Sequence, residues 1–260
     1  MKNLILGTTI LFAGSALSQN GAQNRFESKD KPAVPRLSTD LLMNGGAPEN
    51  EALKQFLLTP PKNSQQLVNK NIAILTSDGV EEIELLAPRR FLEERGAKVD
   101  IVSPRFVPPD KKLGIEYPAQ RESHILTVRF FENGQWVKID RFLDQVAAGD
   151  YNAIIIAGGA WNPDSLRSDP QALQLIRSAV DQNTVIAAIC HGPQVFINAG
   201  IIKNRRVTGF WNIQLDLSNA GAKVIDEPVV VDGNIVTSRY PLDLPQFMAA
   251  ITDRLTQNPI

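Results

Sequence analysis

The order of apolar and polar positions from residue 71 onward predicts strands that alternate with helices. Residues 72–75 are apolar at every position, which is the pattern of a strand buried on both faces. Residues 80–95 then place apolar side chains at helical spacing, and Gly96 suits the end of that helix before the next strand begins at 99–102. Such a strand, helix and strand unit is typical of a parallel sheet.

The second half of the chain repeats this alternation. The predicted elements are strands at 153–157 and 184–189 around a helix at 169–182, then strands at 228–231 and 235–238 and a helix at 244–255. We therefore predict an α/β fold with a doubly wound, mostly parallel sheet sandwiched by helices.

An insertion at about 103–149 interrupts the alternation. It contains two β-prone runs, 125–131 and 136–139, on either side of Asn133-Gly134. Because Asn-Gly between two such runs is a strong signal for a tight turn, we predict an inserted β-hairpin that turns at this dipeptide. The hairpin is expected at the edge of the sheet or over a site.

The first residues have the pattern of a secretory signal peptide. Lys2 precedes a mostly apolar stretch at 4–16 that is too short to span a bilayer, and the small residues Ala16 and Ser18 suit a cut after Ser18. Residues 1–18 are therefore predicted to direct export to the periplasm or the medium, with no membrane association after cleavage. An uncleaved signal anchor is the alternative.

Residues 19–68 are predicted to form an N-terminal extension that is partly disordered, because Asn, Gln, Pro and Lys are frequent there. Within it, 50–58 has helical spacing, and Pro60-Pro61 would end this short helix. We expect the helix to dock on the main domain, residues 69–260, or on a second subunit.

The charge of the chain does not indicate a polyanion as partner. The 27 Lys and Arg residues nearly balance the 28 Asp and Glu residues, for a net charge of −1. The basic residues are scattered rather than gathered in one stretch, so we expect no nucleic-acid partner.

The only cysteine, Cys190, carries the clearest chemical signal. It follows the apolar run 185–189 and precedes His191-Gly192-Pro193, which places it at a strand-to-helix turn. Open α/β sheets bind ligands at this edge, and a helix N-terminus favours a thiolate. A lone cysteine has no disulfide partner in its own chain, and a small buried hydrophobic side chain is the alternative interpretation.

Two other turns are expected at the same edge of the sheet. Residues 77–84 follow the first strand and carry several acids, whereas Gly158-Gly159 follows the strand at 153–157. The turns after successive parallel strands open on one side, so an acid, backbone N–H donors and a thiol would meet there.

These motifs resemble the ThiJ/PfpI superfamily, above all its PfpI branch of intracellular-protease-like proteins. The matching residues lie at 78–85, 156–159, 187–194 and 229–239, and the likeness runs from about residue 70 to 256. The resemblance implies the class I glutamine-amidotransferase-like fold with a flavodoxin-like sheet. It also implies a homo-oligomer, a dimer or larger.

The resemblance assigns a role to each of the three turns. Cys190 would be the nucleophile, and Glu84 would reach its sulfur as a protonated carboxylic acid. Glu81 is the second choice for this acid and is otherwise expected to contact substrate. The Gly158-Gly159 turn would bind substrate, and the Gly159 N–H would share an anion hole with the N–H of residue 191.

His191 would be the acid and base by the same resemblance. Neighbours in sequence do not face each other on a helix, so it serves Cys190 only if the turn is strained or substrate lies between them. The alternative is a histidine that caps the turn or lines the pocket. Asp164 after Pro163 resembles an acid that reaches the histidine of an adjacent subunit, and a helix N-cap is its alternative role. Trp211 is expected to shape the substrate pocket.

No set of metal ligands or phosphate-binding loop is visible. One cysteine and two separated histidines have no zinc spacing, and Gly158-Gly159 lacks the further glycines or the lysine of a nucleotide loop. We therefore expect neither a metal nor a cofactor.

The resemblance suggests an exported cysteine enzyme that acts on a small carbonyl substrate. Our preferred hypothesis is glyoxalase or deglycase chemistry on methylglyoxal or its adducts, through a hemithioacetal. One alternative is a peptidase or amidase that acts on a peptide through a thioester. The other is a non-catalytic oxidative-stress sensor or chaperone in which Cys190 is oxidised.

Overall fold

The computed structural model describes residues 42, 44–106 and 118–257, which belong to one compact unit of the chain. The predicted signal peptide and the first part of the extension lie outside the described residues, as does the segment 107–117 of the insertion. No described helix has the length and apolar character needed to cross a membrane.

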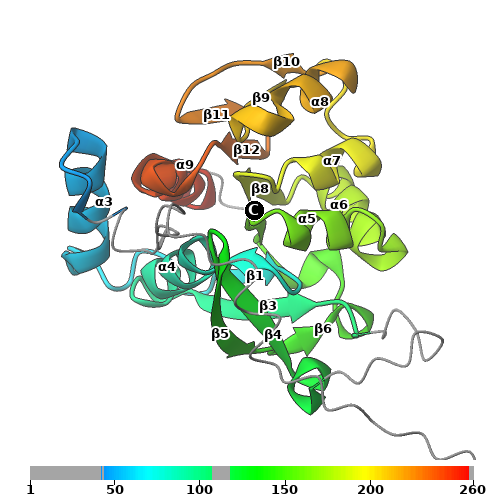
Figure 1. Cartoon of the computed structure of the whole chain (residues 1–260), viewed down its shortest axis with the longest axis horizontal. Coiled ribbons are helices and arrows are strands. Elements are labelled where there is room, and N and C mark those ends of the chain that lie inside the picture. The colour runs from blue at the N-terminus through cyan, green and yellow to red at the C-terminus, as the bar shows by residue number, and fades with distance from the viewer. Residues whose placement is uncertain (1–41, 43, 107–117, 258–260) are drawn as a thin grey trace, which may run out of the picture. The chain divides into compact units, whose positions relative to one another are not determined.

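A seven-stranded sheet forms the centre of this unit (Figure 1). Its strands are β1 (Asn71–Leu75), β3 (Lys98–Ser103), β6 (Arg141–Phe142), β7 (Ala153–Ile156), β8 (Val185–Ile189), β11 (Val229–Asp232) and β12 (Ile235–Ser238). The order is β11-β12-β8-β7-β1-β3-β6, and every pair is parallel except β11 with β12. Because β1 lies between β3 and β7, the chain winds outward in both directions from it. The predicted doubly wound, flavodoxin-like fold is confirmed.

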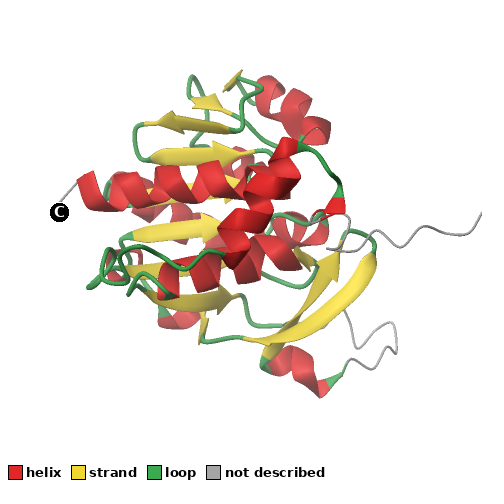
Figure 2. Cartoon of the chain, turned by 90° about the vertical axis from the view of Figure 1, so that its left-hand side faces the viewer, coloured by secondary structure: helices red, strands yellow, loops and turns green. Residues whose placement is uncertain are grey.

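Helices cover both faces of the sheet (Figures 1 and 2). One face carries α4 (Glu82–Glu93), α9 (Leu244–Gln257) and α3 (Pro48–Leu58), and the other carries α5 (Trp161–Leu166), α6 (Pro170–Asp181) and α7 (Gln194–Ala199). Side chains alternate along a strand, so Ile72 and Ile74 join the core cluster beneath α4 and α9, whereas Ala73 and Leu75 join the opposite cluster. Strands that supply both cores must be apolar at every position.

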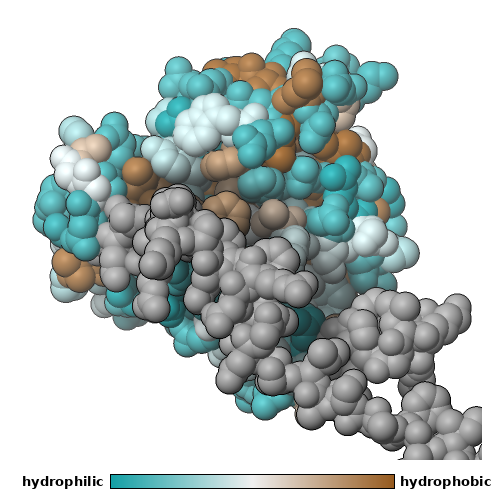
Figure 3. Space-filling model, viewed as in Figure 1, coloured by the Kyte–Doolittle hydropathy of each residue, from teal (hydrophilic) through white to brown (hydrophobic). Residues whose placement is uncertain are grey.

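Short elements complete the fold. A small parallel pair is formed by β9 (Arg206–Val207) and β10 (Lys223–Val224) next to α8 (Gln214–Asn219), and 3₁₀ turns lie at η2 (Ala119–Glu122), η3 (Leu143–Gln145), η4 (Ala148–Asp150), η5 (Trp211–Ile213) and η6 (Pro241–Asp243). The surface in Figure 3 is mostly hydrophilic where it is coloured, with hydrophobic residues gathered over α8 and the β9–β10 pair. Leu215 of α8 is 69% exposed there.

The short helix predicted in the N-terminal extension is present as α3. Its Leu53 is wholly buried, and the Phe56 ring stacks on Phe91 of α4 with 5.1 Å between ring centroids. It also contacts η6 and α9, so it docks on the main domain of its own chain. The helix ends at Leu58, just before Pro60.

The inserted hairpin is present, but its predicted turn is wrong. Strands β4 (His124–Arg129) and β5 (Glu132–Lys138) turn at Phe130-Phe131, and Gly134 lies inside β5 instead of in the turn. Together with β2 (Val80–Glu81), which pairs with β4, they form a separate three-stranded sheet at the start of α4.

Contacts from α4 explain this register. The Glu82 carboxylate accepts hydrogen bonds from Thr127 Oγ1 at 2.7 Å and from the Gln135 N–H at 3.1 Å. A Cβ atom on Gly134 would lie 2.5 Å from the same carboxylate and 2.2 Å from Thr127 Oγ1. Gly134 therefore provides space for a side chain of another element, which the local Asn-Gly signal does not reveal.

Replacing Gly134 by alanine is expected to lower the free energy of unfolding by about 1–3 kcal/mol, the usual cost of overpacking a filled space. Chemical denaturation measures it. The matched control is Gly149→Ala, because a Cβ there meets nothing closer than Gln182 Oε1 at 3.4 Å. Equal losses in the two variants would contradict the close contact at Gly134.

Candidate active site

Cys190 lies directly after β8 in a strained backbone conformation. Its φ angle is +62°, in the left-handed region that residues other than glycine rarely adopt. The Cys190 N–H donates to the Ser238 carbonyl at 3.1 Å, and its own carbonyl accepts from the Phe210 N–H at 2.9 Å. Gly192 follows in the same turn, where a Cβ would lie 2.7 Å from the Ile156 carbonyl oxygen. Neighbouring strands and loops therefore hold this conformation in place.

Glu84 lies in the first turn of α4 and reaches Cys190. Its side chain is wholly buried, its Oε2 accepts a hydrogen bond from the Gly158 N–H at 2.8 Å, and it interacts with the cysteine. Its Oε1 has no hydrogen-bond partner among the described residues. Burial raises the pKa of Glu84 well above its ordinary value, and a charge on Glu81 raises it further. Burial therefore favours the neutral form of Glu84.

The Gly158-Gly159 turn closes the third side of the site. A Cβ on Gly158 would lie 2.5 Å from both Cys190 Cβ and Glu84 Oε2, and Gly159 has a φ angle of +78°. The backbone N–H groups of Gly159 and His191 both lie near the cysteine sulfur and lower the pKa of its thiol. Two converging N–H donors of this kind can stabilise an oxyanion that forms beside the sulfur.

The charge on the sulfur depends on Glu84. Burial raises the pKa of the Cys190 thiol, and a negative charge on Glu84 would raise it further, whereas the N–H groups of His191 and Gly159 lower it. The helix expected to favour a thiolate begins only at Gln194 and has six residues. A carboxylate at Glu84 would oppose a negative charge on the sulfur more than any other charged group nearby. The proton on Glu84 removes that repulsion, so this proton, rather than a helix N-terminus, favours the thiolate.

His191 contacts Cys190 although the two residues are neighbours in sequence. Its Nδ1 lies 3.3 Å from the cysteine sulfur, which the left-handed φ angle of Cys190 makes possible. The sequence predicted that His191 could serve Cys190 only through a strained turn or with substrate between them. The structure shows the strained turn. Burial lowers the pKa of His191 below 6.5, so the ring is neutral at pH 7 and able to accept a proton.

Glu81 and Glu82 hold the hairpin. Glu81 is the N-cap residue of α4, and its carboxylate accepts from the Phe130 N–H at 2.9 Å. Burial raises the pKa of Glu81 to about 7. Glu82 points to the hairpin as well, where it pairs with Arg129 at 2.8 Å. Contact of Glu81 with substrate stays a prediction.

Asp164 and Trp211 lie outside the cluster around the sulfur. Asp164 is exposed within α5, whose N-cap residue is Ala160, so the predicted N-cap role is wrong. Its contact with a neighbouring subunit stays a prediction. Trp211 is 44% exposed, and its Nε1 donates to Asp226 at 3.3 Å.

Asn162, which no sequence motif singled out, is a wholly buried residue that joins two of the turns. Its amide nitrogen donates to the carbonyls of Ala157 and Gly158 at 2.7 and 3.1 Å, and its oxygen accepts from the Ser77 N–H at 2.7 Å. The glycine turn is therefore held against the turn after β1. The available signal was a polar residue shortly after the paired glycines, next to a proline.

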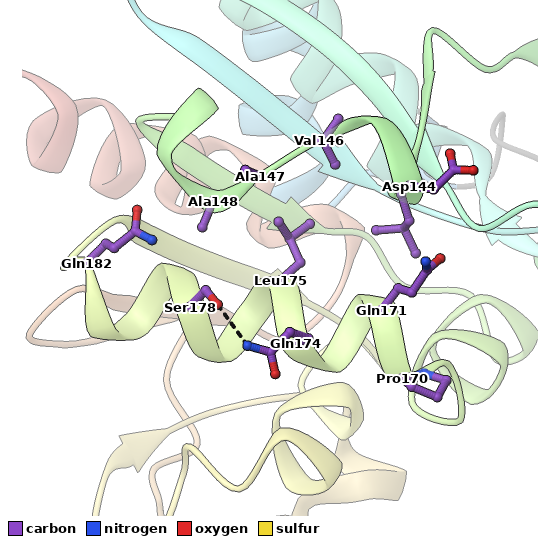
Figure 4. Close-up of a pocket in the computed structure, with 11 residues that line it drawn as sticks. Asp144, Val146, Ala147, Ala148, Pro170, Gln171, Gln174, Leu175, Ser178 and Gln182 are labelled. Atoms are coloured by element: carbon purple, nitrogen blue, oxygen red, sulfur yellow. Dashed lines mark hydrogen bonds between the residues drawn. The ribbon is translucent and has the colours of Figure 1, made fainter.

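A pocket elsewhere on the described surface is separate from this cluster. The pocket in Figure 4, of about 510 Å³, lies between α6 and the segment of η3 and η4, and no predicted site residue lines it. Within residues 42, 44–106 and 118–257, no group of three or more His, Cys, Asp or Glu residues is placed to hold a metal ion.

The fold and the site define a class of α/β proteins in which a cysteine at a strained strand-to-helix turn meets a buried carboxylic acid. The chain belongs to the DJ-1/PfpI family, whose family model matches residues 70–254.

Individual relatives agree with this assignment. A Bacillus subtilis protein named "Putative cysteine protease YraA" is 38% identical over 180 residues, which are 69% of this chain and 95% of its own. A Pyrococcus furiosus protein named "Deglycase PfpI" is 34% identical over 177 residues, which are 68% of this chain and 94% of its own. The crystal structure of Drosophila melanogaster DJ-1beta has a TM-score of 0.61 and 23% identity over 73% of this chain and 91% of that one, and it shows the shared fold.

The raised pKa of Glu81 predicts a pH-dependent stability. The folded chain holds this proton up to about pH 7, whereas an ordinary glutamate releases it near 4.5. The free energy of unfolding should therefore fall as the pH rises from about 4.5 to 7, by about 3 kcal/mol from this group. In Glu81→Gln the free energy of unfolding should lack this decrease of about 3 kcal/mol between pH 4.5 and 7.

Denaturant unfolding at several pH values measures this difference. The amide oxygen introduced by Glu81→Gln can still accept from the Phe130 N–H, so the hairpin contact is kept. Glu122→Gln, at an exposed glutamate, is the control and should follow the wild-type curve. Parallel curves for wild type and Glu81→Gln would refute the raised pKa.

Proposed function

We propose that this chain is a cysteine-dependent enzyme that converts reactive aldehydes, with methylglyoxal as the small substrate, by glyoxalase or deglycase chemistry. The arrangement around the Cys190 sulfur supports this proposal best. A thiol, a neutral acid, a neutral imidazole and two N–H donors converge on one buried atom. Such a compact set suits a small electrophilic carbonyl.

The first step is addition of the sulfur to the aldehyde. The Cys190 thiol gives its proton to His191 Nδ1, and the sulfur electron pair forms a bond to the aldehyde carbon. The π electrons of the carbonyl move to its oxygen, where the N–H groups of Gly159 and His191 stabilise the negative charge. The His191 imidazolium then gives the proton to this oxygen, and the product of the step is a hemithioacetal.

The second step is an internal redox rearrangement. A base removes the hydrogen of the former aldehyde carbon while a proton adds to the ketone oxygen, which gives an enediol. A proton then adds to the former ketone carbon and the hydroxyl on the sulfur-bearing carbon loses its proton, which gives a thioester of lactate. Water then adds to the thioester, the carbon–sulfur bond breaks, and Cys190 leaves with its electron pair. The sum is methylglyoxal plus water to lactic acid, so the step needs no external oxidant or reductant.

Relatives support a cysteine-dependent enzyme in this family, since one is named as a deglycase and another as a cysteine protease. Amide hydrolysis through a thioester remains the competing reaction. Export and a homo-oligomeric state remain predictions from the sequence.

The test is lactate formation from methylglyoxal by the purified full chain, without added thiol or metal. Wild type should form lactate, Cys190→Ser should form none, and Glu84→Gln should lose at least about 100-fold, the usual share of a positioned proton donor. A chain that forms no lactate but hydrolyses peptides through Cys190 would be the competing peptidase.

A thiol-based sensor is distinguished by the same set of proteins. Such a protein forms neither lactate nor cleaved peptide, yet Cys190 gains oxygen on treatment with peroxide, which intact-mass measurement detects. That outcome would overturn the proposed enzyme.

A further inference from the structure

Phe210 contacts both members of the Cys190–His191 pair. Its backbone N–H donates to the Cys190 carbonyl at 2.9 Å, and its ring stacks on the His191 imidazole with 4.9 Å between centroids and 26° between planes. The ring also packs against both core clusters and meets Trp211 edge-on at 5.5 Å. Phe210 is therefore fixed from several sides.

The His191 ring has few other contacts that could orient it. Within the part of the chain that the structure describes, no carboxylate contacts this ring, and its polar contact is the Cys190 sulfur at 3.3 Å. A histidine that acts as a base usually needs a third group that holds its orientation, most often a carboxylate. Within this chain, the flat face of Phe210 is the group that packs against the His191 ring.

We propose that Phe210 is the positioning residue of this site, which orients the His191 imidazole towards Cys190 by ring stacking within a single chain. The inference rests on the Cys190 chemistry proposed above and concerns contacts within one chain; the contact of Asp164 with a neighbouring subunit stays a separate prediction. Its part in the reaction is indirect. With hydrogen on Nε2, the held ring presents the lone pair of Nδ1 to the thiol, takes its proton, and leaves the electron pair on the sulfur.

The charged groups around the pair are few, so a pH profile can be interpreted. Cys190 is the titratable side chain against the ring, and Glu84 and Glu81 of α4 act on the sulfur from the other side. Beyond Trp211 lies Arg239, which is paired with Asp226 at 3.1 Å and with Asp243 at 2.8 Å. None of these groups is altered by a substitution at Phe210.

The test is the rate of Cys190 alkylation by iodoacetamide across the pH range in the full chain. In this reaction the sulfur forms a bond to carbon and iodide leaves, so no aldehyde turnover is involved. Replacing Phe210 by leucine should raise the midpoint of the pH–rate profile by about 0.5–1 unit, which is a 3- to 10-fold loss of thiolate below the midpoint, the size expected from one lost aromatic stack. If the substitution only changed how easily iodoacetamide reaches Cys190, the alkylation rate at high pH would change and the midpoint of the profile would not.

NMR titration gives a second readout on the histidine itself. The chain has two histidines, so the ring signals of His191 are assigned by comparison with a His124→Gln protein. In Phe210→Leu the His191 pKa should rise towards 6.5, because the ring that buries the imidazole is gone. Phe210→Tyr keeps the stacked ring and should retain both the wild-type midpoint and the wild-type His191 titration.

Phe91→Leu is the matched control. It makes the same substitution at a ring stack of similar geometry, 5.1 Å and 24°, on the outer side of α4. Its alkylation midpoint should equal that of the wild type even where it lowers stability. An unchanged midpoint and His191 titration in Phe210→Leu would overturn the proposal, as would an equal shift in Phe91→Leu. A shift confined to Phe210→Leu would support it, even if the wild type formed no lactate.

Discussion

The site depends on one buried carboxyl group that stays neutral. Glu84 is wholly buried, so its ionisation would place a negative charge beside a sulfur that must itself become negative. Buried surroundings stabilise two neighbouring negative charges poorly, so the carboxyl group stays neutral when the sulfur is negative. The missing Cβ at Gly158 and the bracing by Asn162 maintain the geometry around this acid, whereas the hydrogen bond from the Gly158 N–H acts against burial and lowers its pKa.

The main sheet was predictable from the sequence because its strands supply two cores. A strand such as β8 is buried at every position and gives an unbroken apolar run, which few other elements produce. The hairpin turn was not predictable in the same way. Its register follows from the carboxylates of Glu81 and Glu82, whose hairpin partners are 49 and 53 residues away in sequence, and a local Asn-Gly signal carries no information on contacts of that range.

Some residues of the candidate site were predictable from the sequence, and others were not. Cys190, Glu84 and the paired glycines follow strands of one parallel sheet, so their meeting was a consequence of topology. The direct contact of His191 with Cys190 depends on a left-handed residue within the turn, and Asn162 acts through backbone groups of two different loops. Backbone conformation and loop-to-loop hydrogen bonds leave little trace in residue patterns, so these features came from the structure.

The start of α4 joins the surface of the protein to its most deeply buried proton. Glu81 binds the backbone of the hairpin tip, where Phe131 is 89% exposed, and Glu84 follows within one helical turn. One hydrogen bond and one turn of helix therefore separate the most exposed aromatic ring of the hairpin from the acid beside the sulfur, so the boundary between surface and buried site is only a few residues thick.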